Sequence, residues 1–386
     1  MHFSANVHSR HLLVSKIFKQ YRMKSKRYIL LALAAIVQAV LPGASPAGQG
    51  NEYLDMDITQ LMSITVTSVA KKKQSLLDAA AAVFVITQED IRRSGATTLP
   101  DALAMAPGVH VAKINSGKWS VSTRGFGGLK SNKLLVLIDG RSIYSPAYSG
   151  VFWDMQNTML EDVERIEVIR GPGGTLWGAN AVNGVINIIT KQARDTTGSL
   201  LRISGGNQLF GAAGRYGAKL GENTHGRAYV SYDNYGSNSL YETKQSTQDK
   251  WRPLQTGFRF DGELDEELAW TLQGDAYRNE AEQFVSFLWL PDPPYLSDGF
   301  QDSSLHRGAN LVGRIHKHMG AGKSLTFKAY YDYARRSEHY YQLDFDTLDL
   351  DLQYEAPWGQ CHNLTFGAGY RSVWGKFSAL RRFKWI

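Results

Sequence analysis

Hydrophobic and polar residues alternate along much of the second half of the chain. In the segment KSLTFKAYYDYARR, one face is apolar and aromatic and consists of Leu325, Phe327, Ala329, Tyr331 and Tyr333. The other face consists of Thr326, Lys328, Tyr330 and Asp332. The same period of two recurs in the segments PLQTGFRFDG, ELAWTLQGDAYR, DLDLQYE and HNLTFGAGYRS. This period predicts β-strands with one apolar face, which a membrane barrel and a soluble sandwich both contain.

The links between these strands favour a barrel. From residue 199 to residue 386 the pattern predicts about nine strands, each of about ten residues. The links GENTH, ELDEE and HMGAGK are short, whereas the links 235–252 and 279–307 are long. Outer-membrane barrels alternate short periplasmic turns with long extracellular loops in this way. The first hairpin, near residues 205–210, is the exception because it is short on the outer side.

Residues 75–195 mix predicted strands, short helices and glycine turns, and so predict a small α+β domain. VFVITQEDI predicts a strand that runs into a helix, and KLLVLIDGRSIY predicts two strands joined at Asp139–Gly140. TTLPDALAMAPGV predicts a helix with Thr97 or Thr98 as its N-cap and Pro100 in its first turn. VERIEVIRG and GVINIITK predict two further strands. The expected fold class is therefore an α+β domain followed by antiparallel transmembrane strands.

The N-terminal region resembles an export signal. Lys24, Lys26 and Arg27 precede the apolar run 29–37, and small residues follow it. This order predicts a signal peptide that is cleaved after Ala47, within an N-terminal region of residues 1–47. The alternative is a single N-terminal anchor helix. The residues before Met23 do not fit the signal pattern, so Met23 is the expected start instead of Met1.

Composition narrows the classes of function. The chain has 386 residues and a net charge of +7, from 43 Lys and Arg against 36 Asp and Glu. No basic stripe interleaves with aromatic residues in its middle, so we expect no nucleic-acid partner. Cys361 is the single cysteine. It excludes an intramolecular disulfide and a cysteine-based metal cluster.

The glycine-rich segments carry no enzyme motif. GPGGTLWG has Trp-Gly where a phosphate-binding loop needs Lys-Ser/Thr, and GFGGLK lacks the third spaced glycine of a dinucleotide fingerprint. His316 and His318 would share one side of a strand, as a metal pair or as two solvated side chains. Asp139 is explained by its place in a turn. We expect no enzyme activity, no catalytic residue, no cofactor and no bound metal.

An ordered set of segments over residues 64–191 resembles the plug domain of TonB-dependent outer-membrane receptors. The set consists of AAAAVFVITQEDI, SGATTLPDALAMAPGVHV, VSTRGFGG, KLLVLIDGRSIY and ERIEVIRGP followed by LWGANAVNGVINIIT. In that family a plug fills a 22-stranded barrel. The glycines would allow the tight turns of a compact plug; they are Gly171, Gly173, Gly174, Gly178 and Gly184.

The resemblance implies a partner and a set of plug contacts. A periplasmic segment, residues 48–74, would carry a TonB box that adds a strand to the inner-membrane partner TonB. Its residues are Ile64, Thr65, Val66, Thr67 and Ser68. Arg124 and Arg170 would face acidic barrel residues, or be ordinary solvated charges. Glu164 and Glu167 would take part in these plug–barrel contacts or pair inside the plug. The barrel itself would contact outer-membrane lipid.

The function that the resemblance implies is active uptake of a scarce nutrient, most often a ferric siderophore. Haem, cobalamin or another metal chelate are the alternatives. The predicted ligand contacts are Asn115, Lys118, Trp119, Tyr144, Tyr148 and Trp153. The aromatic side chains among them would stack on a chelate or pack against the barrel wall. A non-transporting remnant and a secreted β-rich enzyme are the competing classes.

The strand count departs from the family. About nine strands fit between residues 199 and 386, against 22 in a full barrel of this type. An open sheet edge is not tolerated within a membrane. We therefore expect the chain to be truncated, and the alternative is a smaller barrel that other chains complete.

Overall fold

The structure is a computed structural model. It describes residues 65–66, 74–75, 81–125, 127–128, 133–171, 173–178, 180–289, 296–359 and 362–379. The predicted signal peptide, Met23, most of the segment 48–74 and Cys361 lie outside the described residues. In the described part of the chain, no helix is long and apolar enough to cross a membrane.

A five-stranded sheet forms the centre of the plug, with the strand order β3–β8–β9–β6–β7. Its strands are β3 (Ala82–Thr87), β6 (Leu134–Ile138), β7 (Arg141–Ser142), β8 (Val163–Arg170) and β9 (Gly184–Thr190). β6 and β9 are parallel, and the other pairs are antiparallel. All five residues of β6 are buried, because β6 lies inside the sheet and both its faces are covered.

The helices of the plug begin where the sequence predicts. Thr87 caps α3 (Gln88–Ser94) and Thr98 caps α4 (Leu99–Leu103), each in a capping box with the aspartate three residues later. The other elements before the nine-stranded sheet are short: β1 (Thr65–Val66), β2 (Gln74–Ser75), β4 (Val109–Lys113), β5 (Trp119–Thr123), η2 (Trp153–Met155), η3 (Leu160–Asp162), α5 (Gly174–Trp177) and η4 (Ala193–Thr196). The predicted α+β plug domain is confirmed.

One glycine of the plug shows why its sheet needs glycine. A Cβ at Gly184, the first residue of β9, would lie 2.5 Å from the main-chain oxygen of Ile169 on β8. Any larger residue would push β8 and β9 apart, so this position requires close backbone approach.

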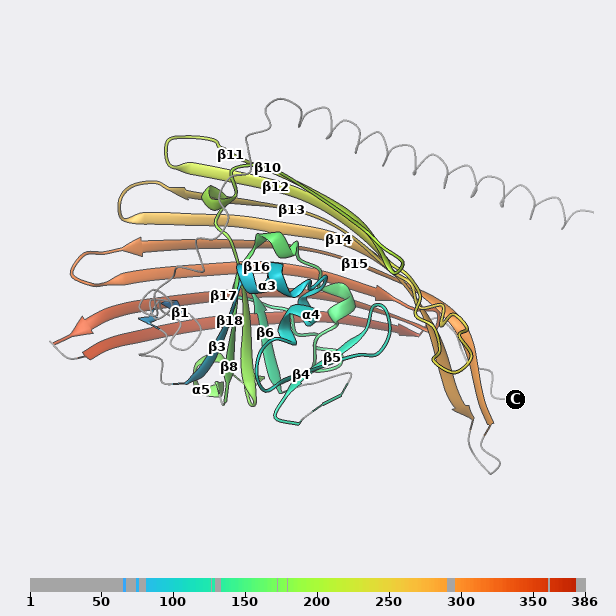
Figure 1. Cartoon of the computed structure of the whole chain (residues 1–386). Coiled ribbons are helices and arrows are strands. Elements are labelled where there is room, and N and C mark those ends of the chain that lie inside the picture. The colour runs from blue at the N-terminus through green and yellow to red at the C-terminus, as the bar shows by residue number, and fades with distance from the viewer. Residues whose placement is uncertain are drawn as a thin grey trace, which may run out of the picture. The chain divides into compact units, whose positions relative to one another are not determined.

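A nine-stranded antiparallel sheet follows the plug, and its strands pair in chain order (Figure 1). The strands are β10 (Gly198–Gly205), β11 (Leu209–Lys219), β12 (Thr224–Tyr235), β13 (Trp251–Glu263), β14 (Leu268–Trp289), β15 (Leu296–His318), β16 (Ser324–Ser337), β17 (Tyr341–Trp358) and β18 (His362–Ala379). Antiparallel order places the links 206–208, 236–250 and 338–340 at one end of the sheet. We call this the long-link end, after the link 236–250.

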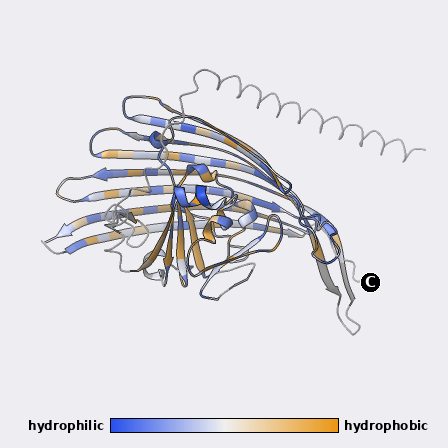
Figure 2. Cartoon of the chain, in the orientation of Figure 1, coloured by the Kyte–Doolittle hydropathy of each residue, from blue (hydrophilic) through white to orange (hydrophobic). Residues whose placement is uncertain are grey.

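Hydrophobic and hydrophilic residues alternate along the strands of this sheet (Figure 2). Their side chains alternate between the two faces, as the sequence pattern predicts. On β16, Tyr330 is 2% exposed and faces the plug, whereas its neighbour Tyr331 is 45% exposed on the outer face. On β18, Arg371 pairs with Asp349 on the inner side, and Tyr370 is exposed. The outer face thus presents an apolar surface of the kind that contacts lipid.

The predicted long link 279–307 is wrong over most of its length. β14 extends to Trp289 and β15 starts at Leu296, and the two strands pair continuously from Leu268↔Lys317 to Trp289↔Leu296. The prolines at 291, 293 and 294, which suggested a loop, lie outside the described residues. Backbone pairing with β15 therefore carries β14 beyond the about ten residues of a membrane-spanning strand.

The plug and the inner face of the nine-stranded sheet share one hydrophobic core. Trp251 of β13 is 1% exposed and meets Trp119 of β5 edge-on, with ring centroids 5.3 Å apart. Tyr235 of β12 stacks on Trp251 and donates a hydrogen bond of 2.9 Å to the main-chain oxygen of Thr97. Aromatic packing therefore fixes the plug against β12 and β13.

Candidate ligand pocket between the plug and the sheet

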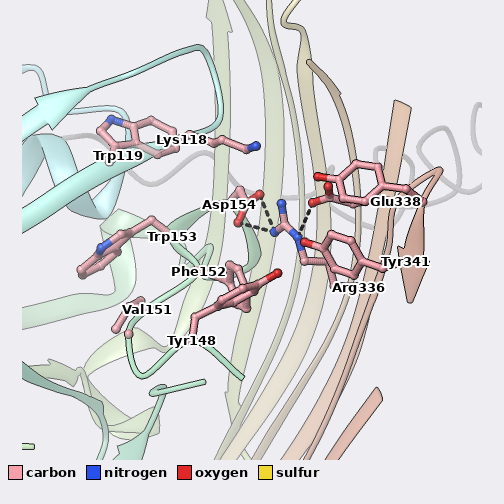
Figure 3. Close-up of a pocket in the computed structure, with 12 residues that line it drawn as sticks. Lys118, Trp119, Tyr148, Val151, Phe152, Trp153, Asp154, Arg336, Glu338 and Tyr341 are labelled. Carbon is pink, nitrogen blue, oxygen red and sulfur yellow. Dashed lines mark hydrogen bonds and ion pairs between the residues drawn. The ribbon is translucent and has the colours of Figure 1, made fainter. Parts of the chain in front are cut away.

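A pocket of about 150 Å³ opens between the plug and the long-link end of the sheet (Figure 3). The plug side consists of the turn before β5 and of the segment 148–154. The sheet side consists of the end of β16 and the turn to β17. We call it the outer pocket. Half of its lining residues are aromatic; they are Trp119, Tyr148, Phe152, Trp153, Tyr340 and Tyr341.

An ion cluster forms the floor of the outer pocket. Nη1 of Arg336 donates to both carboxylate oxygens of Asp154, at 2.8 and 3.0 Å. Nε of Arg336 donates to Glu338 at 2.7 Å. The three side chains are at most 4% exposed. We call Asp154, Arg336 and Glu338 the Asp154 cluster; it joins the plug to β16.

The main chain at Asp154 is held as firmly as its side chain. Its carbonyl oxygen accepts hydrogen bonds from Nε1 of Trp251 at 3.2 Å and from Nδ2 of Asn279 at 2.8 Å. Asp154 is the middle residue of the 3-10 turn η2. One plug residue therefore contacts β13, β14 and β16.

Charge pairing keeps both carboxylates of the cluster ionised. Burial would raise the pKa of Asp154, but the Arg336 guanidinium outweighs it and holds the pKa below its usual value. Burial likewise opposes ionisation of Glu338, yet Arg336 and a hydrogen bond from Tyr340 lower its pKa to about 2. The cluster thus carries one positive and two negative charges at neutral pH.

Lys118 supplies the second cation of the outer pocket. Burial and the nearby Arg336 lower the pKa of Lys118. Its ammonium group donates to Gln283 of β14, and Gln283 in turn donates to Glu338 at 3.1 Å. Lys118 therefore balances the extra negative charge of the Asp154 cluster. The pocket combines aromatic faces with paired charges, which suits the organic periphery of a bulky ligand.

The turn that carries Lys118 is pinned to the long link 236–250. The main-chain N–H of Ser116 donates to Asp249 at 2.9 Å, and its hydroxyl donates to the carbonyl of Gly236 at 2.7 Å. Asp249 also accepts from Asn238, which shapes the link. The turn before β5 and the link 236–250 are therefore joined by hydrogen bonds.

Further ion pairs join the plug to the sheet away from the pocket. Arg141 pairs with Asp332 of β16 at 2.9 Å. Asp162 contacts Arg215 of β11 and lies 3.6 Å from Arg227 of β12. Asp139, predicted only as a turn former, also accepts hydrogen bonds from Thr190 and from Gln273 of β14, while keeping a φ of 50° in the turn.

The structure brings four of the six predicted ligand contacts to the outer pocket: Lys118, Trp119, Tyr148 and Trp153. Trp119 and Trp153 are only 2% and 5% exposed, so they mainly pack in the core. Tyr144 lines a neighbouring cavity instead. Asn115 accepts a hydrogen bond from Gly117 and so shapes the turn before Lys118.

The residues predicted to hold the plug in the barrel do not line the outer pocket. Arg124 is exposed, and Arg170 donates a long hydrogen bond of 3.5 Å to the carbonyl of Pro107 within the plug. Glu164 and the buried Glu167 both pair with Arg165, the inside-the-plug alternative. In the described part of the chain, no ion pair joins Arg124, Arg170 or Glu164 to the nine-stranded sheet.

Of the predicted TonB-box residues, the structure describes two. Thr65 and Val66 form β1 and pair with Ser75 and Gln74 of β2. Ile64, Thr67 and Ser68 lie outside the described residues.

No candidate metal centre occurs among the described residues, where no group of three or more His, Cys, Asp or Glu side chains converges. His316 and His318 lie together with ring centroids 4.5 Å apart, and His316 bonds to Thr326. The outer pocket therefore offers aromatic faces and hydrogen bonds rather than ligands for a bare ion.

Sequence reasoning missed the Asp154 cluster. Asp154 and Arg336 are 182 residues apart, and neither belongs to a recognisable motif. Arg336 does fall on the polar face of an alternating strand, which is the one available signal.

Residues 75–185 match the family model described as the TonB-dependent Receptor Plug Domain. The vitamin B12 transporter BtuB of Vibrio vulnificus is 34% identical over 157 residues, which is 40% of this chain and 25% of that transporter. The chain thus matches about a quarter of the length of this curated relative.

Two solved structures share the fold of plug and strands. The ferripyoverdine receptor of the outer membrane of Pseudomonas aeruginosa aligns with a TM-score of 0.63 and 14% identity, over 81% of this chain and 45% of that receptor. The siderophore receptor PiuA of Acinetobacter baumannii aligns with a TM-score of 0.62 and 18% identity, over 79% of this chain and 47% of that receptor.

Proposed function

Because the chain belongs to the TonB-dependent receptors of the outer membrane, we propose that it takes part in energised uptake of a bulky metal chelate. The observation that carries this proposal is the outer pocket, where aromatic side chains of the plug and of the β16–β17 turn face one another. Its volume of about 150 Å³ is below the about 300–1,000 Å³ of small-molecule pockets. It would therefore hold one edge of a large ligand.

The first ligand to test is vitamin B12. The likeness to a vitamin B12 transporter covers the plug, which supplies one wall of the outer pocket. The near balance of charge around Asp154, Arg336, Glu338 and Lys118 suits an uncharged, amide-rich ligand surface. A ferric siderophore, which the sequence analysis placed first, is the second candidate, since aromatic faces also suit its organic part.

TonB is the proposed energy-coupling partner. Thr65 and Val66 are extended in β1, which is the backbone conformation that strand addition uses. Their pairing with β2 involves only two residue pairs, which a partner strand could replace.

The test is uptake by cells of the native host. Accumulation of radiolabelled vitamin B12 and of radiolabelled ferric enterobactin would be measured with the gene intact, with the gene deleted, and in the absence of TonB. We expect accumulation of one of them that needs both the gene and TonB. Uptake of both that is unchanged by deleting the gene would contradict the proposal for these ligands.

A further inference from the structure

A second cavity, of about 250 Å³, lies beside the outer pocket between the plug and strands β16 to β18. Its plug wall comes from β7 and the segment that follows it, including Ser142 and Ser145. Its sheet wall includes Tyr330 of β16. We call it the inner cavity.

Two hydroxyl groups in the plug wall of the inner cavity have no hydrogen-bond partner among the described residues. They belong to Ser142 and Ser145, whereas the hydroxyl of Tyr330 in the sheet wall has Arg371 as its partner. Ser142 is 9% exposed. Buried hydroxyls are normally paired, because an unmet hydrogen bond destabilises the fold. Two of them on one wall of a cavity therefore form an unused hydrogen-bonding surface.

The charges in the wall of the inner cavity are, in contrast, already paired. Asp332 accepts from Arg141 at 2.9 Å, and Arg371 donates to Asp349 at 2.7 Å. Arg336 is held by the Asp154 cluster. The hydrogen bonds still open to a ligand thus come from neutral hydroxyls, which favours an uncharged polar group over an anion or a cation.

Phe152 and Arg336 separate the two cavities, since both residues line both of them. The guanidinium carbon of Arg336 lies 4.6 Å from the centre of the Phe152 ring. Arg336 is fixed by two carboxylates, whereas the Phe152 ring is held only by packing, against this guanidinium and against Tyr148 at 5.0 Å between ring centroids. Rotation of the Phe152 side chain would therefore join the cavities without breaking the Asp154 cluster.

We propose that the inner cavity is a second subsite, which binds an uncharged amide- or hydroxyl-bearing arm of the transported chelate after that arm passes Phe152 and Arg336. This inference rests on the proposed uptake function. The cavity is smaller than a whole-ligand pocket, so it would hold a part of the chelate at a time.

The first experiment removes the two unpaired hydroxyls, in a Ser142→Ala and Ser145→Ala double variant. Surface binding of radiolabelled vitamin B12 and ferric enterobactin, measured on de-energised cells, should stay unchanged. TonB-dependent accumulation should slow by about fivefold, as expected for lost hydrogen bonds. Ser199→Ala is the matched control, since that serine is exposed on β10. Unchanged accumulation in the double variant would overturn the subsite.

The second experiment tests the route and needs no transported ligand. Ser145→Cys is introduced into the full chain with Cys361→Ser, and a small water-soluble thiol reagent is added outside the cells. Phe152→Ala should speed the labelling of the new cysteine several-fold. An equal labelling rate with and without Phe152 would overturn the route past this residue. The labelling result stands even if neither chelate is taken up, so the failure of the route and the failure of the uptake function are distinguishable.

Discussion

Asp154 and Arg336 form a buried ion pair in which one guanidinium nitrogen contacts both carboxylate oxygens, at 2.8 and 3.0 Å. Asp154 belongs to the plug and Arg336 to β16, so the pair crosses the boundary between them. Its burial means that removal of one partner leaves the other charge without that counter-ion and without water to replace it.

We expect Asp154→Ala to lower the free energy of unfolding by about 3–5 kcal/mol, because it leaves Arg336 buried with only part of its neutralising charge. The measurement is denaturant unfolding of the full chain in detergent, followed by tryptophan fluorescence. Trp153 and Trp251 are buried near the cluster and report on it.

Two further variants test the reason for that loss. Glu89→Ala removes the partner of the exposed Arg92 and Arg93 on α3 and should leave stability nearly unchanged. Asp154→Ala combined with Arg336→Met should cost less than the sum of the two single variants. Additive losses would mean that the pair is not coupled.

Acid should weaken the Asp154 cluster through Glu338. The pKa of Glu338 is about 2 in the folded protein, below its ordinary value of 4.5. Its ionised form therefore adds stability above about pH 4.5, and this contribution is lost as the pH falls toward about 2. Wild type should exceed Glu338→Gln in Tm at about pH 6, and the difference should shrink by about pH 3. A difference that grows on acidification would contradict the assignment.

Local sequence rules predicted the plug elements and the two faces of the strands well. Thr98 caps α4 because its hydroxyl and Asp101 satisfy free main-chain N–H groups, which depends only on neighbouring residues. Tyr330 and Tyr331 take opposite faces because side chains in a strand alternate. Both rules act within a few residues, so the sequence shows them directly.

The ion pairs between plug and sheet could not be predicted in this way. Arg124 and Arg170 were chosen by resemblance, whereas Arg141 and Arg336 make ion pairs across the boundary between the plug and the described strands. Which arginine meets a carboxylate depends on how the plug sits against the strands, and that arrangement involves residues nearly 200 positions apart. The extent of β14 and β15 was missed for a related reason, since pairing between strands outweighed loop-forming residues.

Gly117 should tolerate no side chain. A Cβ there would lie 2.9 Å from Cγ of Trp251, which the core holds in place. Gly117→Ala should lower stability by about 1–3 kcal/mol through overpacking, measured by the same unfolding experiment. Gly128→Ala is the control, because nothing lies within 4 Å of a Cβ at that position. Equal effects of the two substitutions would count against the close packing of Trp251.

Val66→Pro should abolish energised uptake while leaving surface binding intact. Proline removes the main-chain N–H that strand addition by TonB would use. The measurement compares accumulation of radiolabelled vitamin B12 and ferric enterobactin with their binding to de-energised cells. Val66→Ile, which keeps strand propensity, is the control. Normal uptake by the proline variant would show that residues 64–68 are not the TonB box.

Tyr148→Ala should weaken binding at the outer pocket. The tyrosine lies on its rim, and loss of an aromatic face should raise the Kd for the bound chelate by about three- to tenfold. Equilibrium binding to purified protein measures the change. Tyr216→Ala, on the outer face of β11, is the control and should bind normally.

The depth of the Asp154 cluster also bears on how ligand preference can evolve. The residues at the rim, such as Tyr148 and Tyr340, are partly exposed, whereas Asp154, Arg336 and Glu338 lie buried beneath them. Substitutions at the rim can therefore accumulate without loosening the attachment of the plug. Under the proposed function, ligand preference would change through the rim residues alone, while the ion cluster that attaches the plug to the sheet stays the same.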